Sequence, residues 1–252
     1  MASEDAGHLR AKVPPDSEFF GIVEEAYRVF ASPKPNATDV CDCCMAPAIE
    51  ADFFDNPIAR LPLHYIQDWY FAAYKTSGVT KETWAYLLPR ILEILAAAED
   101  VSQTALEVSL SRFDTGNPGN WSPHQWRVLD RFQRQYMLHS LDHGAACLDD
   151  VLCMFRLGGW PLQDLLDQVA AASDATLARR FWLDWANERA PGCESIWITA
   201  FWEGNDGSIV FDFYTSPRMF ERMETLALTD GTDVTLALKA LEVASIISRH
   251  RK

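Results

Sequence analysis

The sequence lacks any hydrophobic run long enough to cross a membrane. No stretch of the 252 residues approaches the roughly 20 consecutive apolar residues that a membrane helix needs. The N-terminal sequence MASEDAGHLRAK also lacks the apolar core of a secretion signal, and its early acidic residues argue against an organelle transit peptide. These absences predict a cytoplasmic protein with no membrane partner.

Cysteine and positive charge are scarce as well. Six cysteines in a chain of this size are too few for a disulfide scaffold, so we expect reduced thiols. The 22 Lys and Arg residues are outnumbered by 36 Asp and Glu residues, which gives a formal net charge of −14. Such a charge repels nucleic-acid phosphates and favours basic partners. We therefore expect a basic protein as the partner and no nucleic acid, and leave the oligomeric state open.

Familiar catalytic signatures are also missing. The sequence contains no Gly-x-Gly-x-x-Gly, no phosphate-binding loop ending in Gly-Lys-Ser/Thr, no Gly-x-Ser-x-Gly and no His-Glu-x-x-His. No residue is therefore assigned as catalytic or as a cofactor contact, and the sequence leans against an enzyme.

Helical periodicity is what the sequence has in abundance. Hydrophobic residues make up 48% of the chain, enough apolar surface to form a core. They recur at the three- and four-residue spacing of amphipathic helices from Phe19 onward. The pattern predicts an all-α fold of about ten short helices in antiparallel pairs, as an irregular bundle or a solenoid-like stack. Residues 1–15 are polar and aperiodic and are interpreted as a flexible leader, and residues 16–252 as a single helical domain.

Several local signals predict where helices begin or break. Thr80 is a candidate N-cap, and Ser122 with Gln125 can form a capping box. Pro89 lies inside an apolar stripe and should kink or restart its helix. Residues 208–214 have the composition of a strand, but no second strand stands nearby to pair with them, so a helix is favoured.

The sharpest candidate site is the sequence Cys41-Asp42-Cys43-Cys44. Three thiols in four residues can converge on a zinc ion or form a labile disulfide. Zinc sites normally bring a second pair of ligands, and here only isolated residues such as His64 could supply them. Small thiols packed under a loop are the favoured alternative. Cys41, Cys43 and Cys44 stay the candidate zinc ligands, and no other cofactor is expected.

Two further polar clusters have simpler interpretations. His139 and His143 are spaced to share a helix face and could hold a metal, but Gly144 places them at a helix end, where histidine is favoured electrostatically. An acidic run is interpreted as a solvated helix face. Its members are Asp149, Asp150, Asp164 and Asp167.

Taken as a set, several motifs resemble a widespread family of uncharacterised bacterial α-helical proteins. The resemblance covers most of the chain, although Ser77 stands where that family usually has Trp. It implies a helical fold and a bacterial cytoplasmic origin, and no activity. The motifs are Cys41-x-Cys43-Cys44, Lys75-Thr76-x-Gly78, Leu88-Pro89-Arg90-Ile91-Leu92-Glu93, Gly159 with Pro161-Leu162, Ala200-Phe201-Trp202 and Ser216-Pro217.

Two functions from different classes fit these features. The first is an acidic helical protein-binding module, such as an inhibitor or immunity-type protein for a basic toxin. The alternative is a small metal- or thiol-dependent protein that acts through the cluster from Cys41 to Cys44.

Overall fold

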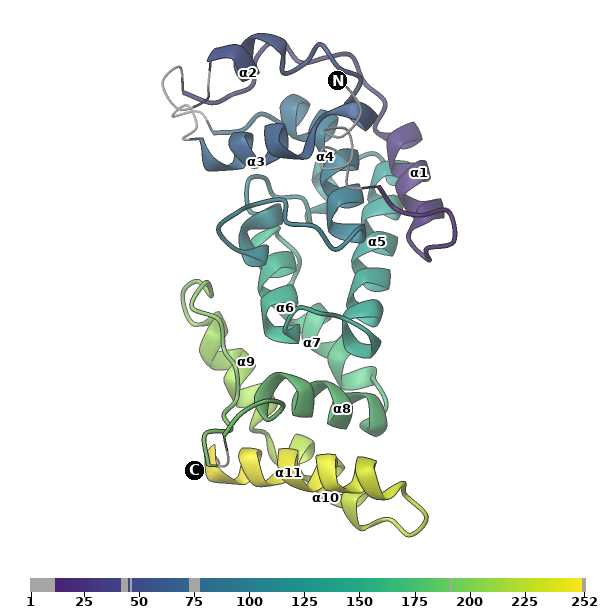
Figure 1. The fold of residues 1–252 in the computed structure, drawn as a ribbon, viewed down its shortest axis with the longest axis vertical. Coiled ribbons are helices and arrows are strands. Elements are labelled where there is room, and N and C mark those ends of the chain that lie inside the picture. Colours follow the sequence, from purple (N-terminus) through teal and green to yellow (C-terminus); the bar gives the residue numbers. More distant parts are fainter. Residues whose placement is uncertain (1–11, 42–44, 46, 73–77, 191, 251–252) are drawn as a thin grey trace, which may run out of the picture. The chain divides into compact units, whose positions relative to one another are not determined.

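A computed structural model of the chain describes residues 12–250 apart from 42–44, 46, 73–77 and 191. Over these ranges the fold is all-α, as the periodicity predicts, with α-helices α1 to α11, three short 3₁₀ helices and no β-strand (Figure 1). No helix in the same ranges is long and apolar enough to span a membrane. Most of the predicted leader, residues 1–11, lies outside the described part, whereas Val13 is buried.

The chain divides into two compact units. Unit 1 comprises residues 1–136 and 157–159, and unit 2 comprises residues 137–156 and 160–252. Compactness alone does not define a folding domain, so the single domain expected for residues 16–252 stays a prediction.

Unit 1 contains the first helices and the larger part of α5. Its elements are α1 (Phe20–Val29), α2 (Pro47–Asp52), η1 (Ile58–Arg60), α3 (Leu63–Phe71), α4 (Lys81–Ala96), η2 (Leu106–Leu110), η3 (Pro118–Asn120) and α5 (Pro123–Asp142) up to Tyr136.

The helix-start signals of unit 1 are confirmed. The Thr80 hydroxyl accepts a hydrogen bond from the Thr83 N–H at the start of α4. Ser122 and Gln125 form the reciprocal bonds of a capping box at the start of α5, at 3.1 and 3.3 Å. Of the kink or restart expected at Pro89, the restart is wrong, since α4 continues through this residue to Ala96, and the kink stays a prediction. Most sides of α4 are buried. The stability gained from this packing outweighs the one backbone hydrogen bond that Pro89 cannot donate.

The core of unit 1 contains two buried tryptophans that satisfy their own polar atoms. The rings of Trp69 and Trp84 lie 6.2 Å apart, and neither side chain is exposed. The Trp84 indole donates to the Thr115 hydroxyl at 2.8 Å, and the Trp69 indole donates to the Thr38 carbonyl at the same distance. Burying the indoles therefore leaves no donor unpaired.

Unit 2 contains the remaining helices. They are the end of α5, α6 (Leu148–Leu157) up to Arg156, α7 (Leu162–Ala171), α8 (Asp174–Trp185), α9 (Asp206–Tyr214), α10 (Pro217–Leu228) and α11 (Val234–His250). Helix α11 packs against α10 and α8 (Figure 1). Phe181 and Trp185 of α8 stack with their rings 4.4 Å apart, and Tyr214 packs edge-on against both. The core of unit 2 is thus built around the C-terminal half of α8.

A buried ion pair fixes where α6 begins. The guanidinium of Arg180 and the carboxylate of Asp184, four residues apart on α8, form a bidentate pair with almost no exposure. Asp184 also accepts from the Leu148 N–H at 3.1 Å, while Arg180 donates to the carbonyls of Ser140 and Gly144. The pair therefore ties the end of α5 and the first turn of α6 to α8.

Candidate functional site

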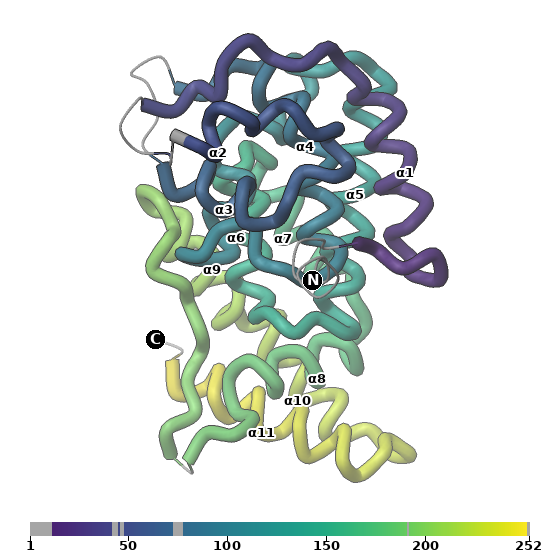
Figure 2. The backbone as a smooth tube through the Cα atoms, turned by 45° about the horizontal axis from the view of Figure 1, so that its top comes forward, coloured from purple at the N-terminus to yellow at the C-terminus, as the bar shows by residue number. Residues whose placement is uncertain are grey.

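Unit 2 contains a stretch of extended chain, residues 193–199, between α8 and α9. Figure 2 shows it as a straight run of the tube after the end of α8. Exposure alternates along it, since Ile196 and Ile198 are half-buried and Trp197 between them is 39% exposed. This alternation is typical of a β-strand with one buried face, although no described segment pairs with it as a strand.

Two neighbouring carboxylates at the start of α6 hold this stretch in place. Asp149 accepts through one oxygen, Oδ2, from the backbone N–H of Thr199 at 2.7 Å and from the indole of Trp202 at 3.0 Å. Asp150 accepts from the indole of Trp197 at 2.8 Å. Both ends of the segment from Trp197 to Trp202 are therefore fixed to one helical turn.

The interpretation of Asp149 as part of a solvated face is wrong, because its side chain is 2% exposed. Burial raises the pKa of this carboxyl to about 7, and the hydrogen bonds from Thr199 and Trp202 offset only part of that rise. The buried hydroxyl of Tyr214 on α9 responds to the same carboxylate: burial first, and then the charge of Asp149, raises the pKa of Tyr214 well above its ordinary value. Asp149 thus acts on both the extended stretch and α9.

Helix α9 confirms the prediction of a helix over residues 208–214. Val210 and Tyr214 are buried on it, whereas Ile209 is 42% exposed. The first turn of α9 lies close to the Trp202 ring because residue 207 is glycine: a Cβ there would stand 3.1 Å from the Trp202 side chain.

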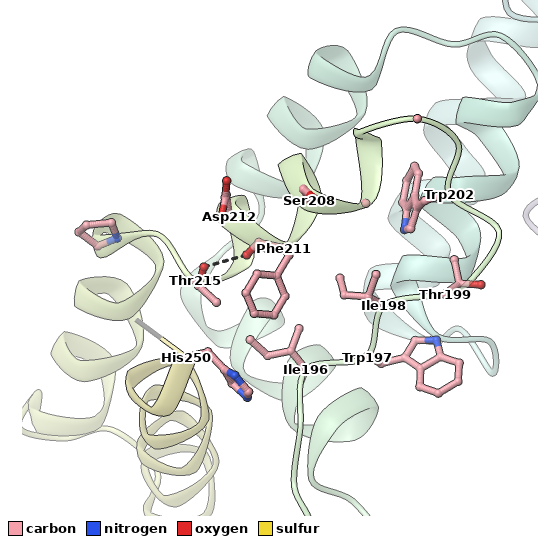
Figure 3. A pocket seen from close by; sticks show the side chains of 13 residues that line it. Ile196, Trp197, Ile198, Thr199, Trp202, Ser208, Phe211, Asp212, Thr215 and His250 are labelled. Carbon is pink, nitrogen blue, oxygen red and sulfur yellow. Dashed lines mark hydrogen bonds between the residues drawn. The ribbon is translucent and has the colours of Figure 1, made fainter. Parts of the chain in front are cut away.

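A groove of about 960 Å³ lies along the extended stretch and α9. Figure 3 shows the side chains of Ile196 and Ile198 directed toward Phe211 of α9, while Trp197 turns away. The imidazole of His250, at the end of α11, packs edge-on against Phe211 with the ring centroids 5.7 Å apart. An isoleucine pair therefore faces an aromatic ring across the groove, within a lining that also carries polar groups.

Charge at the groove is weighted toward carboxylates. Asp212 lines it, is exposed, and has no ion-pair partner in the described ranges. Glu203, next to the lining residue Gly204, is likewise exposed and has no ion-pair partner in the described ranges. By contrast, Arg249 at the His250 end is already paired with Glu194.

One exposed arginine, Arg218, follows the lining residue Pro217. Among the described residues that line or adjoin the groove, the two unpaired carboxylates Asp212 and Glu203 outnumber this one unpaired arginine. The groove therefore favours a ligand that carries positive charge.

Of the three residues predicted as zinc ligands, the structure describes Cys41 alone. Cys43 and Cys44 lie outside the described residues, and Cys41, which is described, is half-buried in unit 1. The rings of His139 and His143 lie 5.9 Å apart at the end of α5. No group of three or more potential metal ligands occurs among the residues that the structure describes. The zinc site at Cys41, Cys43 and Cys44 stays a prediction.

Comparison of the chain with family models, with curated proteins and with solved structures finds no match. The family resemblance of the sequence motifs stays a prediction. Sequence reasoning also missed the groove itself. A usable signal was the pair of tryptophans in the irregular segment, Trp197 and Trp202, because an indole N–H fixed in a loop needs an acceptor, and adjacent aspartates can supply it.

Proposed function

We propose that this protein is an acidic helical protein-binding module of the inhibitor or immunity type, and that its unit 2 groove binds a basic partner protein. The observation that carries the proposal is the open groove, in which an isoleucine pair faces an aromatic ring and Asp212 has no ion-pair partner among the described residues. The net charge of −14 adds long-range attraction for such a partner. The acidic composition and the few cysteines support a bacterial cytoplasmic location.

Apolar exposure near the groove supports a protein as the ligand. Trp197, Phe201 and Ile209 are 39, 37 and 42% exposed and belong to the groove's two borders or the turn between them. Large aromatic and aliphatic side chains of this kind are the usual anchors of protein interfaces, where burial contributes most of the binding energy. Asp212 then contributes specificity and association rate more than affinity.

Site-specific cross-linking in cells that naturally produce the protein tests the proposal. A photoreactive phenylalanine replaces Ser208, which lines the groove, and in a control chain it replaces Thr225, which is exposed on α10. We expect the Ser208 chain to capture a basic protein, identified by mass spectrometry, that the Thr225 chain does not capture.

Charge reversal supplies the matched variant. Asp212→Lys should weaken association with the captured partner by about tenfold at low salt, whereas Asp212→Asn should have a smaller effect. Added salt should weaken the wild-type complex because exposed charges are screened. Equal capture from both positions, or an acidic partner indifferent to salt, would count against the proposal.

A further inference from the structure

The extended stretch presents free backbone groups at Ile196 and Ile198, whereas the Glu194 carbonyl accepts from Arg249 at 3.2 Å. In an extended chain the N–H groups of every second residue point to the same side. The N–H of Ser195 donates to the Trp185 carbonyl at 3.2 Å and that of Thr199 to Asp149 at 2.7 Å, so these residues use the edge that faces the helices. The backbone groups of Ile196 and Ile198 therefore point to the opposite edge. In the described chain they form no hydrogen bond.

The conformation of this edge is fixed before any second strand binds. The indole of Trp197 is fixed by Asp150 and the backbone of Thr199 by Asp149, so the conformation between them does not have to be ordered on binding. An added strand would satisfy the backbone groups of Ile196 and Ile198 at little entropic cost.

We infer that the groove binds its partner by strand addition: an extended segment with Lys or Arg at every second residue pairs with the backbone of Ile196 and Ile198. The inference rests on the proposed function and names the form in which the basic partner binds. Residues directly opposite each other on paired strands place their side chains on the same face. Those level with Ile196 and Ile198 therefore point toward Phe211, as the two isoleucines do (Figure 3).

The chemistry of that face selects the side chain. An Arg or Lys can lay its aliphatic stem on the Phe211 ring and extend its charged head to the Asp212 carboxylate. Asp212 follows Phe211 directly on α9, and it has no ion-pair partner of its own among the described residues. A short apolar side chain would reach the ring and leave the carboxylate unused.

The test uses the full chain and synthetic peptides. The parent probe is a fluorescent, acetylated heptapeptide, Thr-Arg-Thr-Arg-Thr-Arg-Thr amide. One derivative carries N-methyl groups on the backbone nitrogens of the three arginines. The other carries them on the last three threonines, so both derivatives lose the same number of backbone donors. Fluorescence anisotropy measures the binding of each.

Strand addition predicts an asymmetry between the two derivatives. In an antiparallel pair the residues level with Ile196 and Ile198 use their own N–H groups, so methylation of the arginines should weaken binding at least about tenfold and methylation of the threonines about twofold at most. The reverse pattern would support the inference with a parallel strand. Equal loss, or no loss in either derivative, would overturn it, as would failure of the parent to bind.

Variants of the protein test the same edge from the other side. Ile198→Pro removes a donor on the free edge and should weaken parent binding about tenfold. Ile198→Val keeps the N–H and should bind within about twofold of wild type. Circular dichroism and a urea titration establish that both variants are folded. Equal binding by these folded variants would contradict the use of this edge.

The two proposals fail in distinguishable ways. If no peptide binds but a basic protein is still captured from position 208, strand addition is wrong and the binding function stands. If neither occurs, both are wrong. A second copy of the chain is a further occupant to test by light scattering. A dimer that becomes a monomer in the Ile198→Pro variant would overturn the inference, because another copy would then cover the edge.

Discussion

Both units bury charged side chains, and two of these, Arg90 in unit 1 and Asp149 in unit 2, are satisfied in opposite ways. In unit 1, Arg90 has no exposed surface; it donates to the Leu61 carbonyl at 3.1 Å and pairs with Glu93, which also accepts from the Tyr27 hydroxyl. In unit 2, Asp149 is 2% exposed, and its hydrogen-bond donors are neutral: the Thr199 N–H, the Trp202 indole and the Tyr214 hydroxyl.

The difference separates a structural role from a positioning role. The Arg90 cluster joins α4 to α1 and to the end of η1, so it stabilises helix packing through a paired charge. Asp149 holds an extended stretch in which the backbone groups of Ile196 and Ile198 make no hydrogen bond in the described chain. Its carboxylate has no cation to balance burial, which explains why the pKa rises to about 7.

The largest effect is expected from breaking the paired charge. Arg90→Met leaves Glu93 buried without its cation and should lower the free energy of unfolding by about 3–5 kcal/mol. Urea titration followed by circular dichroism measures the loss. The double variant Arg90→Met/Glu93→Leu removes both charges and should recover most of it. A loss below about 1 kcal/mol in the single variant would show that the cluster is not structural.

The unpaired charge should appear as pH dependence. The unfolded carboxyl titrates near 3.8 and the folded Asp149 near 7, so the folded state retains the proton between these values. Its contribution to stability is therefore full below about pH 4, falls by up to about 1.4 kcal/mol per pH unit as the pH rises to 7, and is constant above that. Asp149→Asn should remove this decline.

A second variant at the same position separates the charge from the hydrogen bonds. Asn can still accept from Thr199 and Trp202, whereas Asp149→Ala leaves both donors unpaired and should cost about 1–3 kcal/mol even at pH 4. Urea titrations from pH 4 to pH 8 compare the three chains. An unchanged pH dependence in Asp149→Asn would contradict the assignment of the raised pKa to this residue.

The sequence predicts what depends on neighbouring residues and misses what depends on distant ones. The apolar spacing of α4 and the cap at Thr80 are local, and the helix over residues 208–214 followed from the want of a partner strand. The role of Asp149 depends on Thr199, 50 residues away in the sequence. From the sequence alone, an aspartate next to another aspartate is predicted to be solvated. Only the fold brings in the hydrogen-bond donors that offset the cost of burying its carboxyl.

The smallest effects are expected at two helix N-caps, one in each unit. Thr80 in unit 1 caps α4 and also donates to the buried carboxylate of Asp39 at 2.7 Å, whereas Ser216 in unit 2 caps α10 by accepting from the Met219 N–H. Ser216→Ala should cost about 1 kcal/mol, typical of a lost N-cap. Thr80→Ala should cost about 1 kcal/mol more, because Asp39 loses a donor where it is 8% exposed.

Conservative exchanges act as controls for the two caps. Thr80→Ser and Ser216→Thr keep the hydroxyl and should each stay within about 0.5 kcal/mol of wild type in urea titrations. Equal losses in the two alanine variants would mean that the bond to Asp39 adds nothing to the cap.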